Sequence, residues 1–109
     1  MKQILLFAGL FLAAPALAHA GSVDAKIKEV RVDRDGRGLM RFTSNVNNRP
    51  SCATLTEALA FDTKQPGGES MLRLATAAYL AGKRVIVNGT GQCDVYSTTE
   101  TATILRVVE

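Results

Sequence analysis

The first part of the sequence after residue 20 alternates between hydrophobic and polar residues with the period of a β-strand. Residues 25–34 alternate with one change of parity, since Ile27 lies on one face and Val30 and Val32 on the other. A single strand here therefore needs a β-bulge near Lys28 and Glu29. Residues 34–38 contain Asp-Gly, which favours a tight turn, and residues 39–46 alternate again. These segments predict a β-hairpin.

A third strand, a helix and two further strands follow. A loop is expected at residues 47–50, because Asn-Asn-Arg-Pro interrupts the alternation. Residues 52–61 then predict a strand, and residues 84–88 and 98–108 predict the last two. Between the third and the fourth predicted strands, Gly82 stands where a helix commonly ends in a left-handed residue. The residues before it that recur at helical spacing, and that we expect to pack on the sheet, are Met71, Leu72, Ala75, Ala78 and Tyr79.

The predicted order of elements is β-β-β-α-β-β, which is the order of the OB barrel. We therefore expect a mainly β fold with one helix, closed as a five-stranded OB-type barrel. The last strand is apolar on both faces, as in a barrel that is covered outside by a helix or a partner subunit. The alternative is an open α+β sheet with the same order of elements.

The N-terminal segment has the features of an export signal. Lys2 precedes an apolar run, and Ala18-His19-Ala20 supplies small residues at the positions that signal peptidase reads. The run is shorter than the roughly 20 residues that a membrane span needs. We expect residues 1–20 to be a signal peptide that is cleaved before Gly21, so no membrane span would remain.

The mature chain, residues 21–109, is expected to form a single OB-like domain. Removal of Lys2 leaves 12 basic and 10 acidic residues, which are interspersed as on an ordinary solvated surface. Nucleic-acid binding would call for a basic patch with interleaved aromatic residues. The segment with four arginines between residues 31 and 41 also contains Asp33 and Asp35, so we expect no specific nucleic-acid partner.

Cys52 and Cys93 are the only two cysteines, and export exposes them to an oxidising compartment. We therefore expect one structural disulfide between them. Zinc binding is disfavoured, because the only histidine, His19, leaves with the signal. No metal or other cofactor is expected.

The mature sequence offers little for catalysis. Hydrolytic triads need a histidine or an activated thiol. Two carboxylate pairs remain, Asp33 with Asp35 and Glu57 with Asp62, and the first of them belongs to the predicted turn. Residues 89–91, Gly-Thr-Gly, lack the helix and Lys-Ser/Thr pair of a phosphate cradle. We expect a protein that is not an enzyme.

One loop has the composition of a sugar site, which commonly combines an aromatic face with hydroxyl and charged groups. In OB barrels, the segment before the last strand often binds oligosaccharides or oligonucleotides. A polar surface loop is the alternative interpretation. The candidate ligand-binding residues in this segment are Tyr96, Ser97, Thr98, Thr99 and Glu100.

The segment from Cys52 to Tyr96 contains a series of short motifs: residues 59–63 (LAFDT), Gly67-Gly68, Leu72-x-Leu74-Ala75, Ala81-Gly82-Lys83 and Gly89-Thr90-Gly91-x-Cys93. Through these motifs it resembles small exported bacterial proteins that are similar to the B subunits of subtilase-cytotoxin and pertussis-type toxins. That resemblance implies an OB fold, assembly into a pentameric ring around the helices, and binding of sialylated glycans. The sugar-contacting serine and acidic residues of that family have no match here.

The first hypothesis is therefore a secreted or periplasmic bacterial binding module, a toxin-B-subunit-like protein that forms a homo-oligomeric ring and binds host or surface glycans. The second hypothesis is a monomeric periplasmic domain with a structural or protein-interaction role and an unknown ligand.

Overall fold

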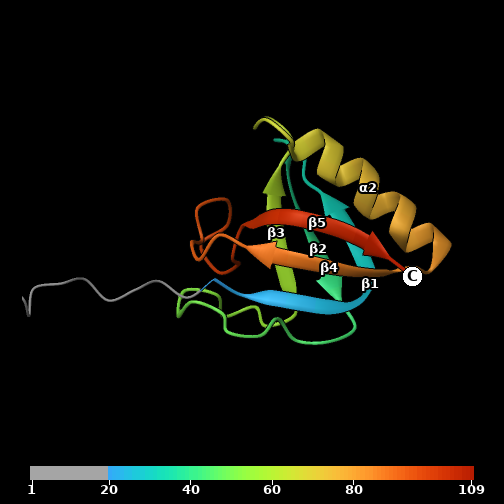
Figure 1. Cartoon of the computed structure of the whole chain (residues 1–109). Helices are drawn as coiled ribbons and strands as arrows, with labels where there is room; N and C mark the ends of the chain where they lie inside the picture. The colour runs from blue at the N-terminus through green and yellow to red at the C-terminus, as the bar shows by residue number, and fades with distance from the viewer. Residues whose placement is uncertain (1–19) are drawn as a thin grey trace, which may run out of the picture.

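The computed structural model describes residues 20–109, which form a mainly β fold with one helix (Figure 1). The expected signal peptide lies, apart from Ala20, outside the described residues. Of the helical segments within residues 20–109, none combines the length and hydropathy that a membrane crossing demands. The elements in chain order are β1 (Ser22–Val32), β2 (Arg37–Phe42), β3 (Ala58–Asp62), α2 (Gly68–Ala81), β4 (Arg84–Gly89) and β5 (Ala102–Val108).

The strands form one antiparallel sheet in the order β3-β2-β1-β4-β5. The pairing of β1 with β2 shifts register between Ile27 and Glu29, which confirms the bulge that the change of parity predicted. The long strand β1 pairs with β2 through its second half and with β4 through its first half. The bulge thus lies close to where β1 changes partners, and the extra twist of a bulge suits such a change.

The sheet is not closed into a barrel, so the structure agrees with the open alternative. Between its two ends, a single parallel bridge joins Ala60 of β3 to Thr101, the residue before β5. The Ala60 N–H donates to the Glu100 carbonyl at 2.8 Å, and the Leu55 N–H donates to the Thr98 carbonyl at 3.0 Å. We call this line of contact, residues 52–60 against residues 93–101, the seam.

Two predicted strands begin later than the alternation indicated. The third strand starts at Ala58 rather than residue 52, because a turn at Pro50 uses the next residues: the Ala53 N–H donates to the Pro50 carbonyl at 3.0 Å. The last strand starts at Ala102 rather than residue 98, because a turn joins Tyr96 to Thr99.

Helix α2 confirms the helical period and its predicted end. Gly82 has φ of 65°, and its N–H donates to the Tyr79 carbonyl at 3.2 Å. A residue with a Cβ would be strained in this left-handed conformation, so glycine is favoured here. The helix packs mainly on β1 and also contacts β3 and β5. Ala75 and Ala78 are buried as predicted, but the prediction for Tyr79 was wrong, since it lies on the outer face and is 45% exposed.

The core fills the space between the curved sheet and α2. Its largest fully buried apolar side chains are Phe42, Met40 and Leu59, which lie on the adjacent strands β2 and β3. Burial of each such side chain stabilises the fold by about 1.5–3 kcal/mol. This cluster therefore fixes the half of the sheet that carries β3, one side of the seam.

A charged network lies on the solvent side of β1 and β2. Arg41 of β2 pairs with Glu29 at 3.1 Å and with Glu57, and Lys28 pairs with Glu57 at 3.2 Å. Arg41, and after it Lys28, lower the pKa of Glu57 below its ordinary value. The two basic groups therefore keep Glu57 ionised beside β1 and β2.

The predicted disulfide between Cys52 and Cys93 is present, and it joins the two sides of the seam. Cys52 lies in the loop before β3, because the strand starts six residues later than predicted. The bond closes a loop of 41 residues in the sequence. In the chain-entropy model, a loop of that length stabilises the folded state by about 4 kcal/mol.

Replacing both cysteines by serine should lower the free energy of unfolding by about 4 kcal/mol. A urea titration of the oxidised wild type and the double variant measures this difference. The wild type under reducing conditions is the control and should lose the same amount. A loss below about 1 kcal/mol in both would show that the seam holds without the bond.

Candidate functional site

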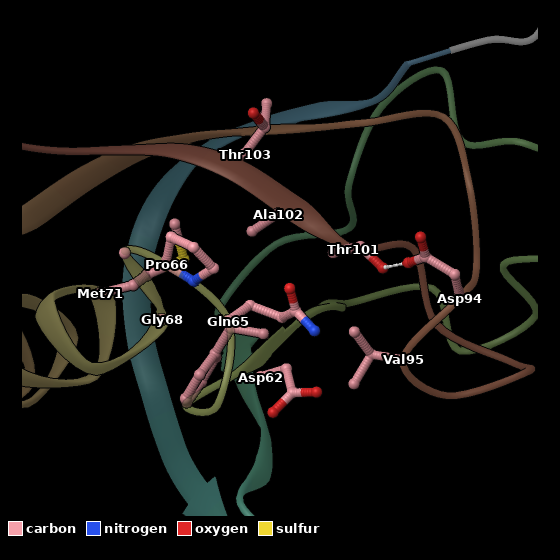
Figure 2. Close-up of a pocket in the computed structure, with 12 residues that line it drawn as sticks. Asp62, Gln65, Pro66, Gly68, Met71, Asp94, Val95, Thr101, Ala102 and Thr103 are labelled. Atoms are coloured by element: carbon pink, nitrogen blue, oxygen red, sulfur yellow. Dashed lines mark hydrogen bonds between the residues drawn. The ribbon is translucent and has the colours of Figure 1, made fainter.

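A pocket of about 500 Å³ opens beside the seam (Figure 2). This volume lies in the range of small-molecule sites. One wall is the end of β3, the turn after it and the start of α2, and the other is the loop before β5 with the first residues of β5. The lining residues are Phe61, Asp62, Gln65, Pro66, Gly67, Gly68, Met71, Asp94, Val95, Thr101, Ala102 and Thr103.

The position of the pocket follows from where β3 and β5 separate. Ala60 and Thr101 are bridged, whereas the next residues on each side, Phe61 and Ala102, already line the pocket. Beyond this point the chain leaves β3 through the turn that leads into α2, while β5 continues along β4. The pocket is thus the space left by two strands that meet once and then part.

The polar groups of the pocket come from both walls. Figure 2 shows the Gln65 carboxamide extending from the turn toward Val95 and Asp94. On the opposite wall, the Thr101 hydroxyl donates a hydrogen bond to the Asp94 carboxylate. On the first wall, the Asp62 carboxylate accepts the Lys64 N–H at 2.9 Å. Each carboxylate is oriented by a neighbour and keeps further acceptor capacity for a ligand.

The pocket combines this polar rim with apolar surface and a negative charge. Met71, Ala102 and Val95 supply apolar contacts between the polar groups. Asp62 and Asp94 are acidic, and none of the twelve lining residues is basic. Such a lining accepts hydrogen bonds from hydroxyl groups and disfavours an anion.

The structure separates the residues that were predicted to bind a ligand. Ser97 and Thr98 are exposed at the tip of their loop, whereas Thr99 and Glu100 are buried. Tyr96 is half-buried next to Val95 of the pocket wall. The five residues therefore do not form one continuous surface.

Tyr96 binds within the protein. Its hydroxyl donates to Asp33, and the Arg37 guanidinium lies over its ring at 4.6 Å from the centroid, with Arg31 at 5.6 Å. Burial raises the pKa of Tyr96, and the hydrogen bond to Asp33 raises it further, so the phenol stays protonated. Its interaction with Arg31 raises the pKa of that guanidinium.

This cluster connects the loop before β5 to the turn between β1 and β2. Arg37 also donates to the Val95 carbonyl at 3.2 Å and pairs with Asp35 at 2.8 Å. The Arg37 backbone N–H, and after it the guanidinium, lower the pKa of Asp35. Tyr96 and Arg37 thus brace the wall of the pocket that carries Val95.

Of the two carboxylate pairs that the sequence suggested, neither forms a paired acidic site. Asp33 and Asp35 bind Tyr96 and Arg37, and Glu57 belongs to the charged network on β1 and β2, away from Asp62. In residues 20–109 there is no group of three or more His, Cys, Asp or Glu side chains placed to hold a metal ion.

Sequence reasoning named Asp62 but missed Gln65, Asp94, Thr101 and Thr103 as residues of one site. Gln65 lies in a turn and Asp94 in a loop, where hydrophobic periodicity carries no information. Their meeting depends on the seam, which joins segments that are about 40 residues apart in the sequence. The cysteine pair was the one available signal, because it predicted that these segments lie close together.

The chain matches no protein-family model, and no curated protein resembles it closely enough to be counted as related.

Proposed function

We propose that this protein is an exported, non-enzymatic binding module whose pocket beside the seam holds a hydroxyl-rich ligand, a glycan. The observation that carries this proposal is the lining of the pocket: two oriented carboxylates and a carboxamide around apolar contacts. Sugar hydroxyls donate to such acceptors, and the C–H face of a sugar ring suits the apolar contacts.

The charge of the pocket refines the ligand class. The toxin resemblance implies sialylated glycans, which carry a carboxylate. Asp62 and Asp94 would repel that group, and none of the lining residues is basic. Arg31 and Arg37, which lie over the Tyr96 ring behind one wall, are engaged with Asp33 and Asp35. We therefore assign neutral glycans to the pocket.

We also propose that the five strands form an OB-type barrel in which the contacts of the seam, in place of a regular strand pairing, join the two ends of the sheet. The strand order, the parallel bridge between Ala60 and Thr101, and the disulfide across the same line support this closure. An OB barrel would give the pocket one stable wall from each end strand.

Assembly into a ring of identical subunits is the proposed quaternary structure. The last turn of α2 and the end of β5 lie at the same end of the molecule (Figure 1). Leu80 is 77% exposed there, and Val107 of β5 also has an exposed side chain. Beyond the bridge at Thr101, residues 102–108 of β5 pair only with β4, so a second copy of the chain would pair with this part of the edge and cover these residues. The competing hypothesis is a monomeric periplasmic domain.

Hydrogen exchange tests the closure of the barrel. If the seam is closed, the N–H groups of Leu55 and Ala60 should exchange as slowly as those in the centre of β1, because exchange then requires opening of the fold. The exposed Ser97 N–H is the fast-exchanging control. Exchange of Leu55 and Ala60 at the rate of Ser97 would show an open edge.

A glycan array with the mature protein tests the ligand, and we expect binding to neutral glycans in preference to their sialylated forms. Gln65→Ala should weaken binding about 2- to 10-fold, the effect of one neutral hydrogen bond, and Asp94→Asn should weaken it more, since a charged acceptor is lost. Gln92→Ala is the matched control, because this glutamine is exposed outside the pocket. Binding to no glycan, or binding that both pocket variants retain in full, would refute the proposal.

The mass of the mature protein in solution tests the ring. We expect a species of about five protomers, in line with the toxin resemblance, and Leu80→Asp should shift it to the monomer because a charge cannot be buried in the interface. Glu69→Gln, on the exposed first turn of α2, should leave the mass unchanged. A monomeric wild type would exclude the ring and favour the alternative.

A further inference from the structure

Glu100 is a fully buried carboxylate in a site built around it. Its side chain is 0% exposed, and its Oε2 atom accepts two backbone hydrogen bonds, from the Gly21 N–H at 2.9 Å and the Gly91 N–H at 2.8 Å. Its Oε1 atom is buried and has no hydrogen-bond partner among the described residues. A buried charge usually has an ionic partner, and a buried polar atom usually has a hydrogen bond.

No basic side chain supplies that partner. The ion pairs within residues 20–109 join other acidic residues to arginine or lysine, and none of them involves Glu100. An uncompensated buried carboxylate costs several kcal/mol. Within the described residues, Glu100 is therefore a buried carboxylate without an ionic partner.

Two glycines, Gly21 and Gly89, leave the space that this carboxylate occupies. A Cβ atom on Gly89 would stand 2.1 Å from Oε2, and a Cβ on Gly21 would stand 2.6 Å from Oε1. Both distances are far below a van der Waals contact, so any side chain at either position would displace the carboxylate. Gly21 thus lies close to both carboxylate oxygens, including the one without a partner.

Gly21 is also the residue that signal cleavage would make the N-terminus. Ala20 is exposed, whereas Gly21 is buried, so the chain enters the fold at the bond that the small-residue motif marks for cleavage. Hydrolysis of that bond consumes one water, leaves a carboxylate on Ala20, and leaves an amine on Gly21 that takes up a proton at neutral pH. The Gly21 nitrogen then changes from a neutral donor of one hydrogen bond into a cation with three N–H groups.

We propose that cleavage between Ala20 and Gly21 creates a buried ion pair between the new α-ammonium group of Gly21 and the Glu100 carboxylate, so that processing completes the fold. One ammonium N–H keeps the existing bond to Oε2, and a second supplies Oε1. The precursor lacks this cation, so its folded state retains the uncompensated charge. This inference rests on the expected cleavage site and is independent of the glycan proposal.

A double-mutant cycle tests the pair. Four proteins are compared. One comprises residues 21–109, one comprises residues 20–109 and so keeps Ala20 in front of Gly21, and the other two are the same proteins with Glu100→Gln. In the Gly21 protein, we expect Glu100→Gln to lower the equilibrium constant of folding at least about 30-fold, because it leaves a buried cation without its anion. In the protein that keeps Ala20, the same substitution should be neutral or stabilising, because it removes a buried charge that has no ionic partner there. Equal effects in the two backgrounds would overturn the proposal.

Chemical labelling provides a second test that requires no variant to fold. In the folded wild type, an amine-specific reagent should label the Gly21 α-amine at least about tenfold more slowly than the same amine in the urea-unfolded protein, as measured by mass spectrometry of peptides. The exposed Lys83 is the internal control and should react similarly in both states. Equal labelling of the α-amine in both states, or an exported protein whose first residue is not Gly21, would refute the ion pair.

Discussion

The structure depends on one buried acidic residue, Glu100. Its carboxylate binds the N–H groups of Gly21 and Gly91, and its backbone carbonyl accepts the Ala60 N–H. It therefore fastens three segments to each other: the start of β1, the loop after β4 and the end strand β3. Burial of a charged group is costly. Here that cost is offset by charge-assisted hydrogen bonds from backbone N–H groups of two separate segments.

The seam follows from this fastening. The disulfide joins its two sides at one end, and the bridge between Ala60 and Thr101 joins them at the other. Between these points, the Leu55 N–H reaches the Thr98 carbonyl. The two end strands of a five-stranded sheet are thus brought together without regular pairing along their length, and the pocket forms where they separate. A fully paired β3 and β5 would leave no such space.

The sequence predicted the local structure well, because local structure depends on residues that are near in the chain. The change of parity at Ile27 predicted the bulge, and Gly82 predicted the end of α2. The disulfide is a long-range contact, and the sequence predicted it because Cys52 and Cys93 are the only two cysteines. The starts of β3 and β5 were placed too early, since alternation continues through segments whose N–H groups are used by turns. Tyr79 was placed in the core because helical spacing does not show how wide the buried face is.

The site could not be predicted in the same way. Glu100 was assigned to a ligand from its polar neighbours in the sequence, and only its three-dimensional surroundings show that it is buried under Gly21 and Gly91. Burial of a glutamate is rare enough that composition argues against it. Gly21 and Gly89 leave room for the buried carboxylate, but in the sequence they indicated only a cleavage site and a turn.

The buried carboxylate and the pocket are connected through the loop before β5. The pocket residue Thr101 follows Glu100 directly, its N–H donates to the Gln92 carbonyl at 2.9 Å, and its carbonyl accepts the Thr90 N–H at 2.8 Å. Its hydroxyl orients Asp94. The loop that carries Asp94 and Thr101 on this wall is therefore anchored by the hydrogen bonds of Glu100. A binding site gains affinity when its groups are ordered before the ligand arrives, because the ordering entropy is then not lost on binding. The contacts that hold Glu100 near Gly21 thus also order one wall of the pocket.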